Sequence, residues 1–422
     1  MPEAIQVSSE IGRLRRVLLQ RPGDEIDRMV PSMMEQLLFD DILDGDQARR
    51  EHDGFRDLLR SAGVETLDAR DLLTDVLASD EVRGSLFAHY RASSRSMSRI
   101  VPRLERLTPG ELAEALVSGL RTEEEGSDHL FDLSPVPNYF FQRDPQVVVR
   151  DRVMISSMAT PAREREPQLA RLIFENHPAF AGCGGLFEIE HPQGRWAGRL
   201  RRHPYPTLEG GDVLVADGDT LLVGISERTN RRGVEVLAQH LQGRDLPLRN
   251  LVLVDLPPRR TYMHLDTVFT FIDHGQALAH LPVIDGSGVE AASVYQVDLS
   301  ARNLTFTVRS SLRKVLADLG HEVELIPCGG SDPMDQEREQ WTDGANAFAV
   351  APGVIFLYRR NRRTLDELAE RGWRILGEEE VLAEDIPLLG HGPTVVTLLG
   401  NELARARGGP RCMTMPLLRD EL

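Results

Sequence analysis

SEIGRLRRVLL, residues 9–19, begins the stretch of sequence that decides the fold class. A loop leads into the apolar run Val17-Leu18-Leu19, which is typical of a buried strand, and a Pro-Gly turn follows it. Residues 48–62 then have helical periodicity up to Gly63, and a second strand is expected at residues 64–67. The order strand, loop, helix, strand indicates an α/β protein.

The pattern changes between residues 71 and 125, where strand signals disappear. Apolar residues recur at spacings of three and four, as at Leu112 and Leu116, and Thr108-Pro109-Gly110-Glu111 is typical of a helix start. We therefore expect a helical insertion at residues 71–128, within an α/β domain formed by residues 1–70 and 129–422. This insertion carries no chemical motif, and its expected role is packing or assembly.

The composition excludes several classes of protein. The chain has 422 residues, of which 41% are hydrophobic and 27% charged, as in a globular protein. Its formal net charge of −17 argues against a nucleic-acid partner, because phosphate binding requires a basic face. The arginine-rich run at residues 195–202 is local and is expected to lie on the surface. Apolar runs are too short for a membrane span, so no membrane partner is expected.

Cysteine and lysine usage narrows the chemistry further. Three cysteines are too few for a disulfide framework or a cysteine-rich zinc site, and the N-terminus does not resemble a secretory signal. These features predict a cytoplasmic protein. Lys314 is the only lysine, and it lies in an amphipathic helical pattern, so Schiff-base and phosphate-loop chemistry are disfavoured.

Cys412 lies ten residues from the C-terminus, in the stretch RGGPRCMTMP of residues 407–416. The glycine pair would let the backbone approach a ligand closely, and prolines stiffen both sides. We expect Arg407 and Arg411 to lower the pKa of the thiol, which would make it a nucleophile. The alternative is a small apolar residue in a terminal strand.

Acidic and imidazole motifs precede this cysteine. Asp144 follows the turn-rich loop PVPNYFFQR, and Glu209 belongs to LEGGDV, residues 208–213, where two glycines separate two carboxylates. Strand alternation in TYMHLDTVF, residues 261–269, would place His264 and Asp266 on one face as a plausible acid–base pair. Each motif also has a structural alternative: an Arg-Asp pair before a strand, a glycine turn, or a hydrogen-bonded core pair.

A polar motif recurs every 57 to 77 residues. The spacing ranges from 57 residues between Glu209 and Asp266 to 77 residues between Asp266 and Asp343, which belongs to the loop WTDGAN. Such spacing suits pseudo-symmetric α/β units that each contribute a loop to a shared axis.

Taken together, FQRDP, LEGGDV, SERT, MHLDTVFT and RCMTMP resemble the arginine deiminase family of guanidino-modifying enzymes, the pentein superfamily. The resemblance implies a five-bladed α/β propeller with an inserted helical domain and a site at its axis. It implies a homo-oligomer and a small-molecule substrate, free L-arginine, with no cofactor and no metal.

The resemblance also implies a role for each matching residue. Cys412 matches the nucleophile and His264 the general acid/base, while Glu209, Asp144 and Asp266 would hold the guanidinium. Arg163 and Arg228 match residues that bind the substrate carboxylate, Asn138 and Phe141 residues that line the pocket, and Arg407 a mobile-loop arginine.

The residue types suit this chemistry independently. A guanidinium is a planar cation and a poor electrophile, so buried carboxylates must orient its donors. A thiolate can then attack its central carbon while His264 protonates the departing nitrogen. The alternatives are a deiminase, dihydrolase or amidinotransferase that acts on a related guanidino compound, and a catalytically silent binding protein.

The chain also departs from the family pattern. Residues 377–399 extend the chain just before the cysteine loop, where they would reshape a lid over the pocket. Ala404 and Ala406 stand where many members have glycine, which should restrict the backbone.

Overall fold

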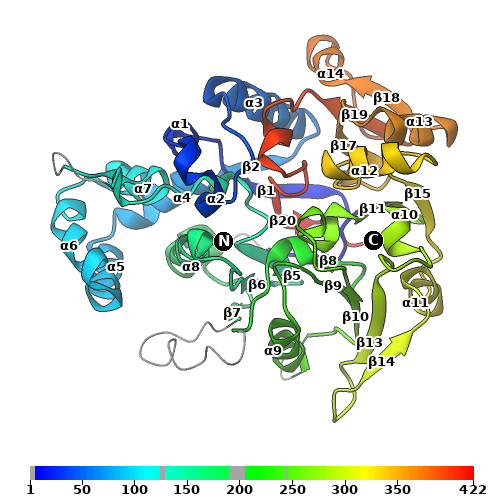
Figure 1. Ribbon diagram of the computed structural model, residues 1–422, viewed down its shortest axis with the longest axis horizontal. Coiled ribbons are helices and arrows are strands. Elements are labelled where there is room, and N and C mark those ends of the chain that lie inside the picture. The colour runs from blue at the N-terminus through cyan, green and yellow to red at the C-terminus, as the bar shows by residue number, and fades with distance from the viewer. Residues whose placement is uncertain (1–4, 124–128, 190–204, 243–245) are drawn as a thin grey trace.

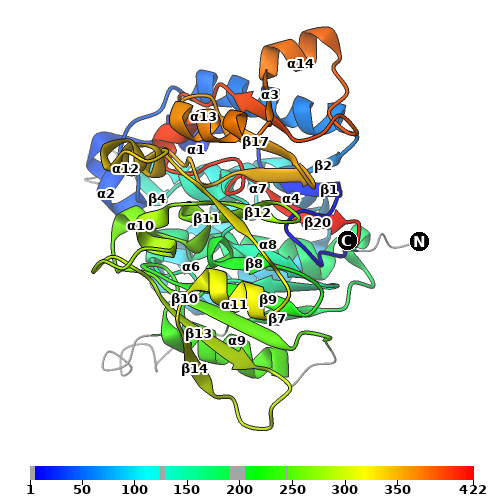
Figure 2. The same cartoon turned by 90° about the vertical axis from the view of Figure 1, so that its right-hand side faces the viewer.

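The computed structural model describes residues 5–123, 129–189, 205–242 and 246–422 (Figure 1). Helices and strands alternate along the chain, as expected for an α/β protein, and the strands form several small sheets rather than one large one. Figure 2 shows the same arrangement from the side, with both described ends of the chain on one flank. The residues 195–202 lie outside the described residues. Within those residues, no helix combines the length and apolar composition needed to cross a lipid bilayer.

The two ends of the chain meet in one sheet. Strand β1 (Leu14–Leu19) pairs in parallel with β2 (Glu65–Asp68) and antiparallel with β20 (Met415–Arg419). Between β1 and β2 the chain forms α1 (Asp24–Asp27), α2 (Met34–Leu37) and α3 (Gly45–Ser61). The side chain of Asp44 caps α3 by accepting a hydrogen bond from the Gln47 amide at 3.0 Å. The strand–helix–strand order expected for residues 9–67 is present, and β20 brings the C-terminal segment beside it.

Four further sheets follow. Their strands are β5 (Gln146–Val149), β6 (Arg152–Ile155) and β7 (Leu186–Glu188); β8 (Val213–Val215), β9 (Thr220–Ile225), β10 (Asn250–Asp255), β13 (Ser293–Asp298) and β14 (Phe306–Arg309); β11 (Phe269–Asp273), β12 (Gln276–Ala279) and β15 (Glu324–Pro327); and β16 (Phe348–Ala351), β17 (Val354–Tyr358), β18 (Arg374–Gly377) and β19 (Thr394–Leu398). In each of them, the first strand pairs antiparallel with the second, and the second strand pairs in parallel with a later strand. For example, β5 is antiparallel to β6, and β6 is parallel to β7. The sheet of β20, β1 and β2 has the same order of pairings.

Helices connect and cover these strands. They are α8 (Arg165–Asn176), α9 (Arg231–Gln242), α10 (Leu281–Ile284), α11 (Leu312–Asp318), α12 (Pro333–Trp341), α13 (Arg362–Glu370) and α14 (Glu378–Glu384). A crossover helix is the usual way to join parallel neighbours, because such strands cannot be linked by a tight turn.

Residues 69–118 form four helices, which lie together at the left of Figure 1. They are α4 (Ala69–Leu77), α5 (Asp80–Ser93), α6 (Arg95–Leu104) and α7 (Pro109–Ser118). The expected start of α7 is present, since Thr108 and Glu111 form a capping box. A short ladder of β3 (Leu120–Arg121) and β4 (Phe131–Leu133), which the sequence did not indicate, follows α7. Buried apolar side chains of these helices belong to the same core cluster as those of β5, β6 and β9.

Residues 377–399 do not form a lid. Helix α14 packs against α3, and β19 is a buried strand between β17 and β18. The run Thr394-Val395-Val396-Thr397-Leu398 is rich in β-branched residues, which favour such a strand, so the expectation of a lid was wrong. This segment completes a sheet.

Candidate active site

Five loop segments supply the polar residues of the site. Each segment precedes a strand of a different sheet, the strand that pairs antiparallel with the central strand of the three described above. Asp144, Glu209, Asp266, Asp343 and Cys412 lie two to five residues ahead of β5, β8, β11, β16 and β20. The side chains of all five are buried. Residues far apart in the sequence therefore reach one buried site because their sheets place them in equivalent positions.

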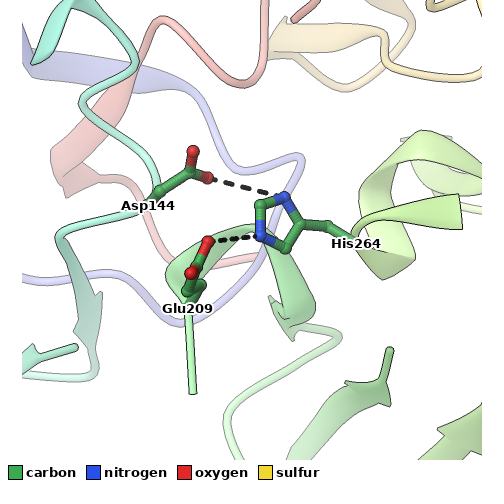
Figure 3. Close-up of side chains that lie close together, drawn as sticks. All are labelled: Asp144, Glu209 and His264. Atoms are coloured by element: carbon green, nitrogen blue, oxygen red, sulfur yellow. Dashed lines mark hydrogen bonds and ion pairs between the residues drawn. The ribbon is translucent and has the colours of Figure 1, made fainter. Parts of the chain in front are cut away.

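The imidazole of His264 lies between two carboxylates (Figure 3). Its Nε2 is 2.9 Å from Glu209 Oε2, and its Nδ1 is 3.7 Å from Asp144 Oδ1. Burial alone would lower the pKa of His264, but the carboxylates of Asp144 and Glu209 outweigh it and raise the pKa to about 9. Burial likewise opposes the charge on Glu209, yet the hydrogen bond with His264 lowers its pKa to about 2. At neutral pH the pair is an imidazolium and a carboxylate.

The backbone around His264 differs from the strand that alternation predicted. His264 follows one 3₁₀ turn, Arg260–Tyr262, and precedes another, Leu265–Thr267, and β11 begins only at Phe269. His264, Leu265 and Asp266 are all buried, so the polar–apolar alternation does not separate two faces of a strand here. His264 and Asp266 do not hydrogen-bond each other, since Asp266 instead accepts from Arg411 at 2.7 Å.

The glycine pair in LEGGDV permits a close approach of the backbone to the site. A Cβ atom on Gly211 would lie 2.6 Å from His264 Nδ1, and one on Gly210 would overlap the Arg143 carbonyl. The Gly210 amide donates to the Asp144 carbonyl at 3.0 Å. These contacts require residues without side chains and bring the Glu209 loop against the Asp144 loop.

The thiol of Cys412 lies in the loop before β20 and is 5% exposed. Its Sγ is 3.8 Å from Asp266 Oδ2. Burial and the carboxylates of Asp266, Asp144 and Asp343 hold the pKa of the thiol well above its ordinary value. The expectation that neighbouring arginines lower this pKa is therefore wrong for the unliganded protein.

The two neighbouring arginines fail to lower the pKa because their charge is used elsewhere. Arg411 pairs with Asp266 at 2.7 Å and with Glu10 at 3.0 Å. The guanidinium of Arg407 stacks on the Trp341 ring, with Cζ 3.3 Å from the ring centroid.

The arginines expected to bind a carboxylate have different surroundings. Arg163 is buried and already paired, with Asp144 and Glu166 both at 2.7 Å. Arg228 is equally buried, but its Nε and Nη1 have no hydrogen-bond partner in the described part of the chain. Its Nη2 donates to Met263 Sδ at 3.7 Å, and its Nε forms a long ion pair with Glu227 Oε1 at 3.9 Å. Arg407 Nε and Nη1 are also without a hydrogen-bond partner among the described residues.

Asn138 and Phe141 contact α2 and the Cys412 loop, respectively. The Asn138 amide donates to the Leu37 carbonyl at 2.8 Å and so holds the end of α2. The Phe141 ring packs on Phe140, with centroids 4.0 Å apart, and against Gly408, where a Cβ atom would overlap it. Both side chains are buried.

Four further residues surround the site, and the sequence alone assigned a role in it to none of them. Asp343, whose pKa burial raises to about 7, faces the thiol, and its WTDG motif was noticed without a role. Glu10, Glu166 and Asn346 contact site residues through buried hydrogen bonds. Glu10 and Asn346 contact partners from other segments, so no local pattern signals their contacts, whereas Glu166 pairs with Arg163 three residues before it in the same segment.

Buried polar atoms without a hydrogen-bond partner in the described part of the chain, on both carboxylates and guanidinium groups, remain in the site; of these, Asp144 Oδ1 has only the long ion pair with His264. Among the described residues, the buried carboxylate oxygens Asp144 Oδ1 and Asp266 Oδ1 have no hydrogen-bond partner. The Nε and Nη1 atoms of Arg228 and Arg407 have none among these residues either. Buried polar atoms are rarely left unpaired, so the site suits a ligand with both a cationic and an anionic group.

The same groups have metal-binding spacing. Ligand atoms of Asp144, Glu209 and His264 lie within 4.8 Å of one another and could hold a metal ion. A metal would have to displace the proton that the raised pKa of His264 retains, and it would compete with Arg163 for Asp144. An organic cation with several N–H donors does not require His264 to lose its proton, because it can donate to the carboxylates directly, although it also meets Arg163 at Asp144.

Comparison with known proteins shows the family of this chain. The family model described as arginine deiminase matches residues 35–108 and 111–419. An arginine deiminase from Listeria monocytogenes serotype 4a (strain HCC23) is 37% identical over 440 residues, covering 100% of this chain and 99% of that protein. One from Bacillus cytotoxicus is 34% identical over 442 residues, covering 100% of both chains.

Among solved structures, an amidinotransferase of saxitoxin biosynthesis from Microseira wollei superposes with a TM-score of 0.56 at 14% identity, covering 99% of this chain and 98% of the other. This similarity concerns the fold. Model and relatives together cover the chain from end to end, so the chain belongs to the arginine deiminase family.

Proposed function

We propose that this chain hydrolyses the guanidinium group of free L-arginine to L-citrulline and ammonia, through a covalent intermediate on Cys412. The observation that carries the proposal is the set of unpaired buried atoms, carboxylate oxygens on one side and guanidinium nitrogens on the other. Free arginine has the complementary charges at its two ends. Family membership points to the same substrate.

The guanidinium would bind among the carboxylates. Asp144 and Asp266 each offer an oxygen without a hydrogen-bond partner among the described residues. Glu209 and Asp144 lie on the two sides of the His264 imidazole. Carboxylates recognise a guanidinium by bidentate, charge-assisted hydrogen bonds, which also fix the plane of the group. Phe141 would line the pocket beside the Cys412 loop, and Asn138 would support that wall.

The substrate carboxylate would bind Arg228. Arg407 lies in the same loop as Cys412, and its Nε and Nη1, which have no hydrogen-bond partner among the described residues, would contact the substrate from that loop. Arg163 is proposed for the same carboxylate, but it pairs with Asp144 and Glu166 in the absence of substrate. Its role therefore requires the ion pair with Asp144 to open when the guanidinium arrives. The new cation then replaces the old one at the same carboxylate.

Substrate binding would activate the thiol. Carboxylates and burial raise the pKa of Cys412 in the free protein, so the thiol is neutral. A bound guanidinium places positive charge against the same carboxylates and lowers the pKa of the thiol. The thiolate attacks the central guanidinium carbon, the protonated His264 donates its proton to the leaving nitrogen, and ammonia departs.

Hydrolysis would complete the cycle. The S-alkylthiouronium on Cys412 keeps its positive charge and stays among the carboxylates. His264, now neutral, accepts a proton from water, and the resulting hydroxide attacks the same carbon. The C–S bond then breaks and the carbonyl forms as the added hydroxyl group releases its proton to solvent, which returns the thiolate and citrulline. No step assigned to these residues consumes a cofactor.

We further propose that the five similar sheets form a five-bladed pseudo-symmetric propeller around the site, with residues 71–128 as a helical insertion in the domain of residues 1–70 and 129–422. The repeated order of pairings and the equivalent placement of the five site residues support this arrangement. We also propose a homo-oligomer in the cytoplasm, where a thiol nucleophile stays reduced.

Mass spectrometry of the protein incubated with L-arginine tests the reaction. We expect citrulline and ammonia, with a transient adduct on Cys412. Cys412→Ala should abolish turnover and the adduct while leaving the circular-dichroism spectrum unchanged. Substantial ammonia release by this variant would remove the cysteine from the nucleophile role, and ornithine among the products would indicate a dihydrolase instead.

Substrate recognition is tested with Arg228→Met. This variant removes the guanidinium but keeps the apolar stem, so we expect KM for L-arginine to rise about a hundredfold, the loss typical of a charge-assisted hydrogen bond. Turnover of agmatine, which lacks the carboxylate, should change far less. Equal losses on both substrates would contradict a role for Arg228 at the carboxylate.

A further inference from the structure

A buried chain of charges connects the N-terminal loop to the nucleophile. The guanidinium of Arg411, 1% exposed, donates through Nε to Glu10 Oε2 at 3.0 Å and through Nη2 to Glu10 Oε1 at 3.1 Å. Its Nη1 donates to Asp266 Oδ2 at 2.7 Å. One arginine thus bridges a carboxylate from residue 10 and a carboxylate beside the thiol.

Both ends of this bridge are fixed. Glu10 Oε1 accepts from the Val215 amide at 3.1 Å, and the Glu10 amide donates to the Val215 carbonyl at 2.8 Å. Arg411 Nη2 also donates to the Val213 carbonyl at 2.9 Å. Burial would raise the pKa of Glu10, but Arg411 and Arg143 lower it to about 2, so Glu10 is charged. Glu10 therefore holds Arg411 by charge and by geometry.

The consequence appears at Asp266. Its Oδ2 receives Arg411 and lies 3.8 Å from Cys412 Sγ, while its Oδ1 is the unpaired oxygen proposed to bind the guanidinium. Asn346 fixes the backbone at the same place, since its Oδ1 accepts from the amides of Arg411 and Cys412 and its Nδ2 donates to the Asp266 carbonyl. Arg411 is fixed by its bidentate pair with Glu10, so the Asp266 oxygen that it binds is fixed as well. The other oxygen of Asp266 then points in a single direction.

We infer that Glu10 and Arg411 are positioning residues, which fix the Asp266 carboxylate beside the thiol and set the net charge that both thiol and substrate experience. The inference rests on the proposed function of Asp266 and Cys412. Glu10 compensates the charge of Arg411, so that Glu10, Arg411 and Asp266 together keep a net negative charge for the substrate. Neither positioning residue needs to touch the substrate.

The two residues carry opposite charges, and this provides the test. Glu10→Gln keeps the shape but leaves Arg411 with one carboxylate, so the thiol should become more acidic. Arg411→Met removes the cation and leaves two carboxylates, so the thiol should become less acidic. We expect shifts of about one pKa unit in opposite directions. Asp144, Asp343 and Tyr358 also face the thiol and stay unchanged in both variants.

The readout is the rate of iodoacetamide alkylation of Cys412 against pH, followed by peptide mass spectrometry without substrate. At a fixed pH near 8, Glu10→Gln should react about tenfold faster than the wild type and Arg411→Met about tenfold slower, because the thiolate is the reactive species. Partly exposed Cys183 serves as an internal reference for reagent and pH. Both variants should also raise KM for L-arginine, by about tenfold.

Arg419→Met is the matched control. Arg419 is similarly buried and its charge acts on Glu10, but it donates to the backbone carbonyls of Gly12 and Ala349 and is not among the groups that act on the thiol. We expect this variant to lower the melting temperature while its alkylation profile and KM stay close to the wild type. Arg411→Lys, which keeps the charge, should fall between wild type and Arg411→Met.

The inference is overturned if Glu10→Gln and Arg411→Met shift the alkylation profile in the same direction, or leave it unchanged while lowering stability like the control. Their contacts would then be structural only. Failure of the proposed function is a separate result, because it would appear as no citrulline from the wild type, whereas alkylation does not depend on turnover.

Discussion

His264 shows at the scale of a single residue how the site controls a proton. Its carboxylate neighbours raise its pKa to about 9, so the imidazolium is available as an acid through neutral pH. The pKa of an unfolded histidine is about 6.5. The pairing therefore stabilises the fold fully below pH 6.5, and this contribution disappears as the pH rises through 9.

An NMR titration of labelled histidine side chains tests this charge state. We expect His264 to titrate near pH 9 in the wild type and at least about one unit lower in Glu209→Gln, because the variant removes its hydrogen-bonded carboxylate. His280, whose pKa burial lowers to about 4, is the control in the same spectra and should not move. A His264 pKa below 7 in the wild type would contradict its role as the acid.

At this scale the sequence predicted chemistry better than contacts. Cysteine, histidine and carboxylates in recurring motifs suggested the reaction, because these residue types suit a guanidinium. The bridge from Glu10 to Arg411 was not predictable, since it spans 401 residues and neither side chain belongs to a local pattern that requires the other. For the same reason the lowered thiol pKa was predicted wrongly, because the partners of Arg407 and Arg411 were unknown.

At the scale of elements, the segment before β20 delivers the nucleophile. Gly408 lies against the Phe141 ring, and its carbonyl accepts from the Tyr358 hydroxyl at 2.9 Å. A methyl group at this position would overlap the ring, so either the loop or the pocket wall must move. The glycine pair noticed in the sequence is thus explained at Gly408 by close packing.

Gly408→Ala should therefore impair catalysis. Overpacking costs about 1–3 kcal/mol, and we expect kcat/KM for L-arginine to fall about tenfold to a hundredfold as the thiol is displaced. Gly84→Ala is the control: Gly84 lies inside α5 with no atom within 4 Å of an added Cβ. It should raise stability by about 0.5–1 kcal/mol through helix propensity and leave activity unchanged. Equal activity in both variants would contradict the packing argument.

Elements with long, unambiguous periodicity were predictable, whereas short ones were not. Helix α3 and strand β1 follow from their apolar patterns, and α7 from its capping box. The alternation around His264 fits two 3₁₀ turns as well as a strand, so packing decided between them. Strand β19 was overlooked because residues 377–399 were interpreted from their place before the cysteine loop rather than from their β-branched run.

At the scale of the whole molecule, a pairing of the first and last strands joins the two ends of the chain, and no local pattern reveals this contact. Strand β20 pairs with β1 at the other end of the chain and thereby positions the Cys412 loop beside segments from the middle. The motif spacing suggested repeated units, and the structure contains sheets with a repeated order of pairings. The pairing of first and last strands had to come from the structure, because their sequences are equally compatible with other partners.

The described helices of residues 69–118 share a core with the sheets, so we expect the chain to unfold as one unit. Leu116 in α7 is fully buried in a cluster that includes Val148 of β5 and Leu221 of β9. Leu116→Ala should cost about 2–5 kcal/mol through lost burial and a cavity. In differential scanning calorimetry it should shift a single transition to lower temperature, and activity should disappear at the same temperature.

Leu382→Ala, at a position 39% exposed in α14, is the control and should leave the transition within about 0.5 kcal/mol of the wild type. Two transitions, of which Leu116→Ala moves only one, would show that the helices fold independently. The core contacts argue for the first outcome, because the helices pack on α8, β2 and α1 and their buried apolar side chains belong to the same core cluster as the strands. The helical insertion would then stabilise the site at a distance, by closing the core beneath the sheets that carry Asp144 and Glu209.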